Sequence, residues 1–323
     1  MLGLVARRTL VAVLVAFLVA SLSFLLIHAA PGDPFAGMRE DPRITPELAR
    51  QTRELYGLDR PLGEQYLRYM SRLARGDLGT SFLQRRPVRA VIADALPNTL
   101  LLMSTAILFA FALGVTLGAL QAYWRGSRFD RLAGSLSLAV ASVPEYLLAL
   151  ALLALFAFLV PLFPTTGIRD PVLWRFFSPL ERLTDVARHL VLPAATLTII
   201  LGAVVARYQR AALLDVLPED FVRTARAKGN PATRVLFVHA LRNALLPTIT
   251  LLGLVFPALV GGAVFVETVF GWPGMGRTIV EALAGRDYPL VVGSLVIGSL
   301  FVVAGSLVAD TAAALADPRT RTA

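Results

Sequence analysis

The sequence predicts an all-α integral membrane protein with six transmembrane helices and both termini in the cytoplasm. Three observations support this fold class: 56% of the 323 residues are hydrophobic and 16% are charged, six long apolar runs follow one another, and arginine is unequally distributed between their connections. The mean hydropathy of +0.67 is also well above that of ordinary soluble chains. Because a helix crosses the ~30 Å hydrocarbon core with about 20 apolar residues, several spans fit this length.

The first span is expected at residues 10–27, an uncharged run of 18 residues. Arg7 and Arg8 precede it, as basic residues precede a secretory signal peptide. The apolar core of a signal peptide is only about 7–15 residues long, and the run lacks a small-x-small cleavage pattern at its end. We therefore expect a retained transmembrane helix.

An external insertion is expected to follow this span, at residues 28–97. Its charge is mixed, and residues 45–56 are typical of a helix, with Pro46 in the first turn and Gly57 just beyond the end. We expect a small folded cap here. In terms of domains, residues 1–93 comprise the first span and this external segment.

The other five apolar runs lie at residues 99–123, 132–160, 190–206, 245–266 and 290–309. Together with their connections they are expected to form one helical core over residues 94–316, followed by a tail at 317–323. The chain shows no internal repeat or low-complexity tract that would suggest another architecture.

The basic residues predict the orientation of these spans. The two tails and the second and fourth connections carry 14 basic and five acidic residues, whereas the opposite connections carry 17 basic and 15 acidic residues. The positive-inside rule then places both termini in the cytoplasm. Residues 28–97 hold 11 of the arginines, but long segments are translocated largely regardless of their charge.

The composition also excludes several kinds of chemistry. The chain has no cysteine, and therefore no disulfide, thiolate metal site or cysteine nucleophile. Its only lysine, Lys228, is followed by Gly229, whereas a phosphate-binding P-loop needs lysine followed by serine or threonine. No histidines or carboxylates have metal-ligand spacing, so we expect no metal site. The net charge of +9 indicates membrane orientation, not a nucleic-acid partner.

The connection at residues 207–242 is expected to contain one isolated short helix. Pro218, Glu219 and Asp220 are typical of a helix start, and Gly229 can supply the left-handed residue that ends one. Asn230 and Pro231 are expected to be the cap and first residue of the next helix. These signals predict a helix of about ten residues, from 219 to 228.

This helix has the composition of a docking element. Phe221 and Ala225 are neighbours one turn apart, and Arg223, Arg226 and Lys228 add positive charge. A short basic helix between two breaks fits into a groove of a partner protein. A solvated connector is an equally supported alternative from the residues alone, since charged runs usually face water.

The same segment resembles the "EAA" loop of permeases of binding-protein-dependent ABC importers, in the form of the dipeptide/oligopeptide/nickel group. Arg223 and Thr224 stand where that loop usually has Glu-Ala, and Arg242 stands where proline is usual. These departures match the peptide-permease variant. The residues that carry this resemblance are Asp220, Phe221, Arg223, Thr224, Ala225, Arg226, Lys228 and Gly229, followed by residues 239–244.

The resemblance extends over nearly the whole chain and is closest to the first permease subunit of that group. Each of the further matching segments is weak alone, but they occur in the same order and at the same membrane positions. They are residues 31–34, 57–61, 75–79, 86–88, 142–144, 267–277, 286–289 and 317–319.

The resemblance implies a type I ABC importer permease of the bacterial inner membrane, working by alternating access. Residues 221–229 would then form a coupling helix in a cleft of a separate ATPase. The ATPase would bind the ATP and Mg²⁺, so that this chain would have no cofactor and no catalytic residue. The expected partners are a second permease subunit, two ATPase subunits, an extracytoplasmic solute-binding protein received by residues 28–97, and membrane lipid.

Candidate pathway residues are Ser142, Pro144 and Glu145, inside the run at 132–160. A carboxylate near the middle of a membrane costs about 2.5–3.5 kcal/mol on insertion scales, so Glu145 should face protein or water. Pairing with backbone groups freed by the proline is the favoured alternative to a role in the pathway. The segment at 271–274 is expected to be a turn, with Trp272 as a candidate interface anchor.

Other functions stay open as alternatives. The cargo of the resembling group includes dipeptides, oligopeptides and nickel chelates, and selection lies largely in the binding protein. A secondary transporter would need more intramembrane ion-coupling residues than the spans contain. A membrane enzyme would need paired catalytic carboxylates or a nucleophile with its base, which the sequence does not indicate.

Overall fold

The computed structural model of the protein describes residues 2–29, 60–255 and 263–316. Over these residues the chain is helical and has no strand, only an isolated bridge between Thr80 and Pro87. The all-α fold class is therefore confirmed for this part of the chain. The helix expected at 45–56 and the tail at 317–323 lie outside the described residues.

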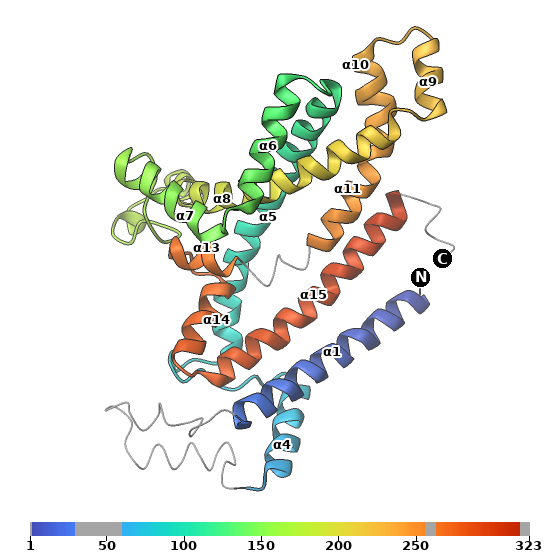
Figure 1. Cartoon of the computed structure of the whole chain (residues 1–323). Helices are drawn as coiled ribbons and strands as arrows, with labels where there is room; N and C mark the ends of the chain where they lie inside the picture. Colours follow the sequence, from blue (N-terminus) through green and yellow to red (C-terminus); the bar gives the residue numbers. More distant parts are fainter. Residues whose placement is uncertain (1, 30–59, 256–262, 317–323) are drawn as a thin grey trace. The chain divides into compact units, whose positions relative to one another are not determined.

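The chain divides into two compact units, which we describe separately. The first comprises Met1–Asn98 and Gly274–Ala304, and the second comprises Thr99–Pro273 and Gly305–Ala323. Two helices contribute to both units: α5 (Val88–Tyr123) and α15 (Tyr288–Ala316) (Figure 1).

The first unit joins α1 (Leu2–Ala29), α4 (Leu62–Ala74) and α14 (Met275–Ala284) to the adjoining parts of α5 and α15. Helix α4 packs on α1 through aromatic rings, with the Phe24 and Tyr66 ring centroids 5.4 Å apart in an edge-on arrangement. Such pairs stabilise by about 0.5–1.5 kcal/mol beyond the area they bury.

A buried carboxylate fixes the segment before α5 to the turn between α14 and α15. Asp287 accepts a hydrogen bond from the Ser81 hydroxyl and another from the Leu83 backbone N–H at 3.0 Å. Val88 and Met275 are fully buried beside this turn, in the apolar core of the first unit. The hydrogen bonds of Asp287 and the apolar core therefore stabilise the same junction.

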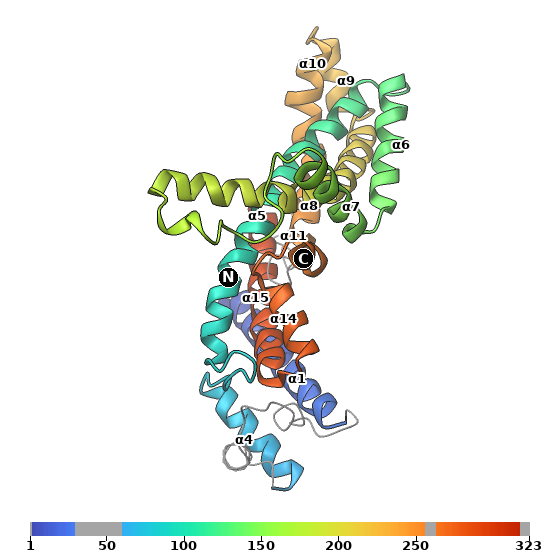
Figure 2. The same ribbon diagram turned by 90° about the vertical axis from the view of Figure 1, so that its left-hand side faces the viewer.

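In its described residues, the second unit contains the remaining parts of α5 and α15 and seven further α-helices. In both ribbon views α9 lies beside α10 at one end of the unit (Figure 1 and Figure 2). A π-helical segment, Val235–Ala240, joins α10 to α11. The helices are α6 (Arg128–Ser142), α7 (Glu145–Leu153), α8 (Pro179–Val216), α9 (Asp220–Ala227), α10 (Ala232–Arg234), α11 (Leu241–Val255) and α13 (Val264–Val269).

Two glycines allow the backbones of α5 and α8 to approach closely. A Cβ atom on Gly118 would lie 2.5 Å from the carbonyl oxygen of Ala206, and one on Gly114 would lie 2.6 Å from Cβ of Val205. Real Cβ atoms do not come so close, so only glycine fits these two positions. Small residues are a common way to pack helices in a membrane, where water does not drive association.

A buried amide ties α8 to α11. The side chain of Gln209 donates a hydrogen bond to the carbonyl oxygen of Ala244 at 3.1 Å and accepts one from the Thr248 hydroxyl at 2.7 Å. Both Gln209 and Thr248 are buried. Because a buried polar group without a partner is costly, these bonds fix the register between the two helices.

Four of the six predicted spans lie within longer helices. The runs at 10–27, 99–123, 190–206 and 290–309 fall inside α1, α5, α8 and α15. The fifth run begins within α11, and its residues 256–262 lie outside the described part of the chain. Among the described residues, three helical stretches are long and apolar enough to cross a membrane, or four if the bent pair of α6 and α7 is one span. The three are Val88–Tyr123, Pro179–Val216 and Ala232–Leu252.

The third predicted span is broken near Pro144, the residue at which the sequence indicates a break. Helix α6 ends at Ser142, and α7 with its π-helical continuation Ala154–Leu159 is bent from α6 by 102°. Val143 has extended dihedrals, φ −78° and ψ 129°, because a residue before proline is pushed out of the helical region. Pro144 then supplies no N–H to continue the ladder.

Candidate docking helix and neighbouring sites

Helix α9 stands between two breaks, as the sequence predicts. Glu219 is its N-cap with ψ 149°, and Lys228 is its C-cap. Gly229 follows with φ +75°, the left-handed conformation that favours glycine. The helix proper, Asp220–Ala227, is one residue shorter at each end than predicted.

The start of the next helix differs from the prediction by one residue. Pro231, not Asn230, is the N-cap of α10. The amide of Asn230 instead donates a hydrogen bond to the carbonyl oxygen of Ala225 at 2.9 Å. Asn230 therefore pairs with a carbonyl group at the end of α9. An asparagine between two helices can cap either of them, and the sequence alone does not show which.

The inner face of α9 is apolar and buried. Val222 is 0% exposed and Ala225 is 7% exposed, one turn apart. They pack in one core with the ends of α5 and α8, including Ala119 and Leu213. Phe221, expected to pair with Ala225, is 43% exposed and lies at the edge of this face. The pair that seats the helix is therefore Val222 and Ala225.

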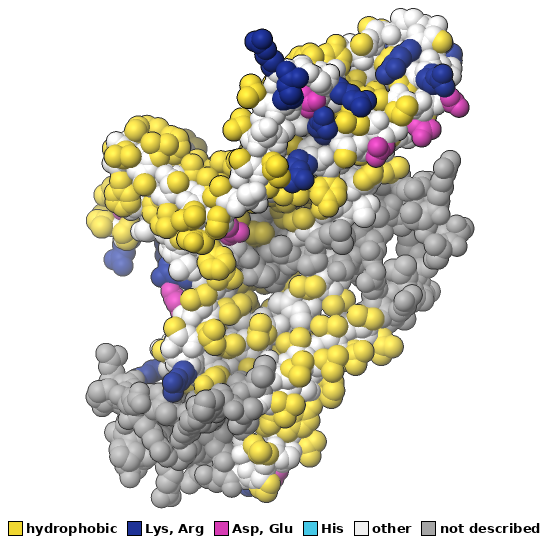
Figure 3. All heavy atoms as spheres, viewed as in Figure 1, with side chains coloured by type: hydrophobic (Ala, Val, Ile, Leu, Met, Phe, Trp, Pro, Cys, Tyr) yellow, Lys and Arg dark blue, Asp and Glu magenta, His cyan; other side chains and the backbone are white. Residues whose placement is uncertain are grey.

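The outer face of α9 is charged and open to solvent. Arg223, Thr224 and Lys228 are exposed, as is Asp220, whose contact with Arg223 is a loose one at 3.4 Å. In Figure 3, Lys and Arg side chains gather over the end of the unit that carries α6, α9 and α10. This face is available for a partner, and its ion pair contributes little stability because both groups are solvated.

A cavity of about 430 Å³ lies between α9 and the ends of the two long helices. We call it the α9 cavity. Its lining is mostly apolar but includes two arginines, one before α6 and one on α9. The lining residues are Ala122, Tyr123, Arg125, Leu214, Leu217, Pro218, Arg226, Ala232, Val235 and Leu236.

A bidentate ion pair braces the same end of the unit. Asp130, 5% exposed, accepts hydrogen bonds from Nε of Arg210 at 2.7 Å and from its terminal nitrogen at 2.9 Å. The Gly126 backbone N–H adds a third at 2.9 Å. These bonds, those from Arg210 foremost, lower the pKa of the Asp130 carboxyl, and the same contact raises the pKa of Arg210.

Sequence reasoning missed this ion pair. Ser127 caps α6 by accepting a hydrogen bond from the Asp130 N–H at 3.1 Å. The serine followed three residues later by an acid is a recognisable cap signal. Nothing in the local sequence points to Arg210, which is 80 positions away.

The three candidate pathway residues meet at the break between α6 and α7. Ser142 is exposed, and its hydroxyl donates to the carbonyl oxygen of Leu138 at 2.9 Å. Pro144 is the exposed N-cap of α7. Glu145 is half-buried and accepts a backbone hydrogen bond from Val266. Its backbone partner thus comes from α13, not from the helix that the proline interrupts.

Helix α13 itself contains a second carboxylate, whose role sequence reasoning missed. Glu267 is fully buried and accepts a hydrogen bond from the Thr99 hydroxyl at 2.8 Å. Gly271, with φ +59°, makes the expected turn. Trp272 is fully buried, so it is not the interface anchor that was considered.

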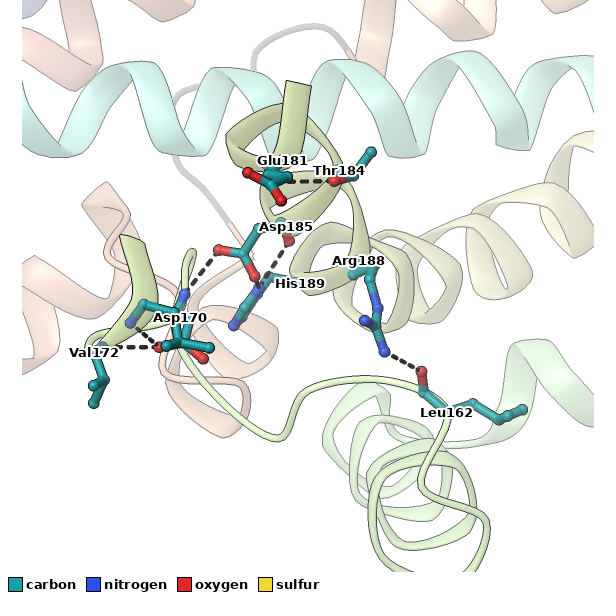
Figure 4. Close-up of polar contacts among 9 residues, drawn as sticks. Leu162, Asp170, Val172, Glu181, Thr184, Asp185, Arg188 and His189 are labelled. Carbon is teal, nitrogen blue, oxygen red and sulfur yellow. Dashed lines mark hydrogen bonds and ion pairs between the residues drawn. The ribbon is translucent and has the colours of Figure 1, made fainter. Parts of the chain in front are cut away.

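A segment held by carboxylates comprises the connection before α8 and the first eleven residues of that helix, residues 161–189. We call it the clamp segment (Figure 4). The Asp170 carboxylate accepts the backbone N–H groups of Val172 and Leu173, both at 2.8 Å, which lowers the pKa of Asp170. Asp185 accepts the N–H of Asp170 at 2.8 Å and lies 3.3 Å from Nδ1 of His189.

Two further contacts complete the clamp segment. Arg188 donates to the carbonyl oxygen of Leu162 at 3.2 Å (Figure 4). Ser178 and Glu181 form a capping box at the start of α8, with the Ser178 N–H donating to the Glu181 carboxylate at 2.7 Å. Helix α8 therefore begins 11 residues before the predicted span, and the capping box could have revealed this.

The surface of the clamp segment is largely apolar. Phe176 is 83% exposed, and Val172 and Leu180 are each 70% exposed. Between them, the ring of Trp174 is flanked by the guanidinium groups of Arg169 and Arg182, at 5.1 and 5.5 Å from its centroid. Each such contact is a cation–π interaction.

Comparison with known families covers almost the whole chain. Residues 114–322 match the family described as "Binding-protein-dependent transport system inner membrane component". Residues 1–103 match the family described as "Binding-prot-dependent transport system membrane comp, N-term".

Individual relatives are similar over their full length. The oligopeptide transport system permease protein AppB of Bacillus subtilis (strain 168) is 40% identical over 316 residues, 98% of each chain. The di/tripeptide transport system permease protein DppB of Pseudomonas aeruginosa (strain UCBPP-PA14) is 40% identical over 334 aligned positions, 99% of each chain. The glutathione transport system permease protein GsiC of Escherichia coli (strain K12) is 37% identical over 321 residues, 99% of each chain.

Proposed function

This chain belongs to the family of binding-protein-dependent transport system inner membrane components, and on that premise we propose that it is the permease subunit of an ATP-driven importer of dipeptides or oligopeptides. Membership makes it a multi-pass protein of the inner membrane and a transport component. The peptide cargo is supported by relatives that are named for oligopeptide, di/tripeptide and glutathione transport. Nickel or another small solute is the alternative cargo.

We propose six spans with both termini in the cytoplasm. The spans would lie within α1, α5, the bent pair of α6 and α7, α8, α11 and α15. The concentration of basic residues in the two tails and in the connections at 124–131 and 207–242 supports this orientation. It would leave α9 on the cytoplasmic side and the clamp segment outside.

We propose that α9 is the coupling helix, seated in a cleft of the ATPase. The observation that carries this proposal is its division into a buried apolar face and a charged outer face, between Glu219 and the left-handed Gly229. Phe221, Arg223 and Lys228 would contact the ATPase. Ala225 would hold the helix to the core of the permease, so that movement of the ATPase is passed on to α8.

The remaining parts of the importer would be separate chains. We propose a second permease subunit, two ATPase subunits that bind ATP and Mg²⁺, and an extracytoplasmic solute-binding protein received by residues 28–97. The chain itself would hold no cofactor and carry out no catalysis, consistent with the lack of a P-loop lysine motif. Ser142, Pro144 and Glu145 would line the pathway where α6 and α7 bend.

A paired substitution tests the coupling proposal. The double variant Phe221→Ala and Arg223→Glu changes the outer face of α9 without touching Val222 or Ala225. In the co-expressed complex, we expect the ATPase to be lost on purification and peptide-stimulated ATP hydrolysis to fall at least tenfold. Retention of both would overturn the assignment.

The matched control for this test is Arg175→Glu in the clamp segment. It makes the same charge change at an exposed arginine. At 1.5 Å per residue, α8 alone separates the two regions by about 55 Å, so this variant should leave ATPase association unchanged. Loss of association in the control would show a general effect of charge, not a docking face.

A further inference from the structure

The α9 cavity lies at the level where two membrane-spanning helices end. Tyr123 is the last residue of α5 and lines the cavity, and Leu214 and Leu217 line it from the end of α8. Both helices are long and apolar enough to cross a membrane. Because the apolar run at 99–123 ends at Tyr123, the α5 side of the cavity lies where the hydrocarbon core gives way to the lipid headgroups.

An aromatic cluster marks the same level. The rings of Tyr123, Trp124 and Phe129 meet edge to face, with centroid distances of 5.5 and 5.3 Å, and all three side chains are partly exposed. Tyr and Trp are enriched at membrane–water interfaces, where an amphipathic ring meets the headgroups. This cluster supports an interfacial position for the cavity independently of where the helices end.

The chemistry of the lining selects an anionic amphiphile. Arg125 and Arg226 are its only charged residues, and the other lining residues are apolar apart from the Tyr123 hydroxyl. Asp130, an acid that interacts electrostatically with Arg125, already accepts hydrogen bonds from Arg210. The guanidinium of Arg226 makes no hydrogen bond or ion pair with another residue in the part of the chain that the structure describes. The cavity thus combines unneutralised positive charge with apolar walls.

The position of Arg226 on α9 favours lipid over the ATPase as the occupant. At about 100° per residue, the buried pair Val222 and Ala225 has Phe221 on one flank and Arg226 on the opposite flank. Arg223 lies on the outer face, about 60° around the axis from Arg226 and about 160° from Phe221. Of these three side chains, only Arg226 lines the cavity, whereas Phe221 and Arg223 do not.

We propose that the α9 cavity binds the headgroup of an anionic phospholipid from the adjoining leaflet, with Arg125 and Arg226 contacting its phosphate. The apolar walls formed by Leu214 and Leu217 accommodate the glycerol and the first part of the acyl chains. Basic pockets between spans are known binding sites for anionic headgroups, and arginine pairs well with phosphate. The site is distinct from the outer face of α9, so it does not depend on ATPase docking.

Native mass spectrometry of the full-length chain in detergent tests this proposal. Phosphatidylglycerol and phosphatidylcholine with the same acyl chains are titrated against wild type, the double variant Arg125→Gln and Arg226→Gln, and the control Arg223→Gln. Wild type and control should prefer phosphatidylglycerol. Each arginine near the surface is expected to contribute about fivefold, so the double variant should lose about 25-fold of that preference.

A second variant keeps the test informative if the double variant folds poorly. Ala232→Trp fills the cavity from an exposed lining position and retains both arginines. It should also lower phosphatidylglycerol retention, at an unchanged melting temperature. Retention of the lipid preference in both variants would overturn the proposal.

Two further readouts separate the alternative occupants. If 10 mM inorganic phosphate displaces phosphatidylglycerol completely, the site binds phosphate alone and the proposal is overturned. If the double variant keeps its lipid preference but loses the co-expressed ATPase, the cavity belongs to the protein interface instead. Loss of lipid preference with ATPase association intact supports the lipid site and leaves the coupling proposal to its own test.

Discussion

The connections at the two ends of α8 are held in opposite ways. Before α8, the clamp segment is fixed by hydrogen bonds to the carboxylates of Asp170 and Asp185, and it exposes apolar side chains such as Phe176. After α8, α9 is seated by the apolar pair Val222 and Ala225 and exposes charge. One end of α8 is thus held by polar contacts and exposes apolar side chains, whereas the other is held by apolar contacts and exposes charged side chains.

This difference has a mechanical meaning. Hydrogen bonds to carboxylates depend steeply on distance and angle, so the clamp segment is held in one geometry. Apolar contacts are not directional, so α9 can shift slightly against its core without losing a specific bond. A coupling helix needs such tolerance, whereas a segment that only shapes a surface does not.

The strongest way to break this comparison is to charge the apolar seat of α9. Val222→Asp places a carboxylate at a position that is 0% exposed, which should cost about 3 kcal/mol or more and release the helix from its core. Because the chain has no cysteine, a single cysteine at Ala227 can report this release through its rate of maleimide labelling. Arg223→Asp, on the exposed face, should leave the rate nearly unchanged, and equal rates in the two variants would contradict the proposed seating.

The ion pair between Asp130 and Arg210 is the polar exception at the α9 end. Asp130→Asn leaves Arg210 without its counterion, and we expect a loss of about 2 kcal/mol, less than for a fully buried pair because Arg210 is one-third exposed. The measurement is thermal unfolding in detergent at neutral pH. A melting temperature equal to that of wild type would mean that the pair contributes no stability.

The same pair predicts a dependence on pH. The pKa of Asp130 is lower in the folded protein than in the unfolded chain, so its contribution is present above the unfolded value of about 3.9 and is lost as the pH falls through the folded value. The free energy of unfolding of wild type should therefore exceed that of Asp130→Asn at neutral pH, and this difference should shrink as the pH drops below about 4. A constant difference between the two at all pH values would contradict this.

Gly229 tests the break that isolates α9. No atom lies within 4 Å of a Cβ built there, so the effect of Gly229→Val should come from its φ of +75° alone, about 1–2 kcal/mol. Stimulated ATP hydrolysis should fall more than membrane insertion. Asparagine tolerates this conformation better than valine, so stimulated ATP hydrolysis in Gly229→Asn should lie between that of wild type and that of Gly229→Val. Unaltered stimulation in the valine variant would mean that α9 does not couple.

The smallest effect is expected at the clamp segment. Asp185→Asn weakens the hydrogen bond to the Asp170 N–H and the contact with His189, which should cost about 1 kcal/mol. Hydrogen exchange at residues 170–173 should rise, while exchange in α9 stays as in wild type. A parallel rise in α9 would show that the two ends of α8 are not independently held.

The sequence predicts what depends on local signals. The apolar runs, the start of α9 and the left-handed Gly229 each follow from residues that are close together in the chain. Pro144 indicates a break, but it does not encode the 102° angle between α6 and α7. The early start of α8 is marked by the capping box of Ser178 and Glu181, which a span defined by hydropathy alone leaves out. Contacts such as that of Gly118 with Ala206 depend on which helices become neighbours, and no local pattern encodes this.

One further consequence concerns α8 itself. Its 38 residues span about 57 Å, longer than the ~30 Å hydrocarbon core, so one rod joins the clamp segment to α9. Its interior proline, Pro193, lies near the clamp end, which leaves an arm of about 35 Å on the side of α9. A rotation of 10° about Pro193 would sweep the far tip through about 6 Å, roughly one helical turn. A rotation at Pro193 would thus turn a small change of angle into a displacement large enough to shift a docked subunit.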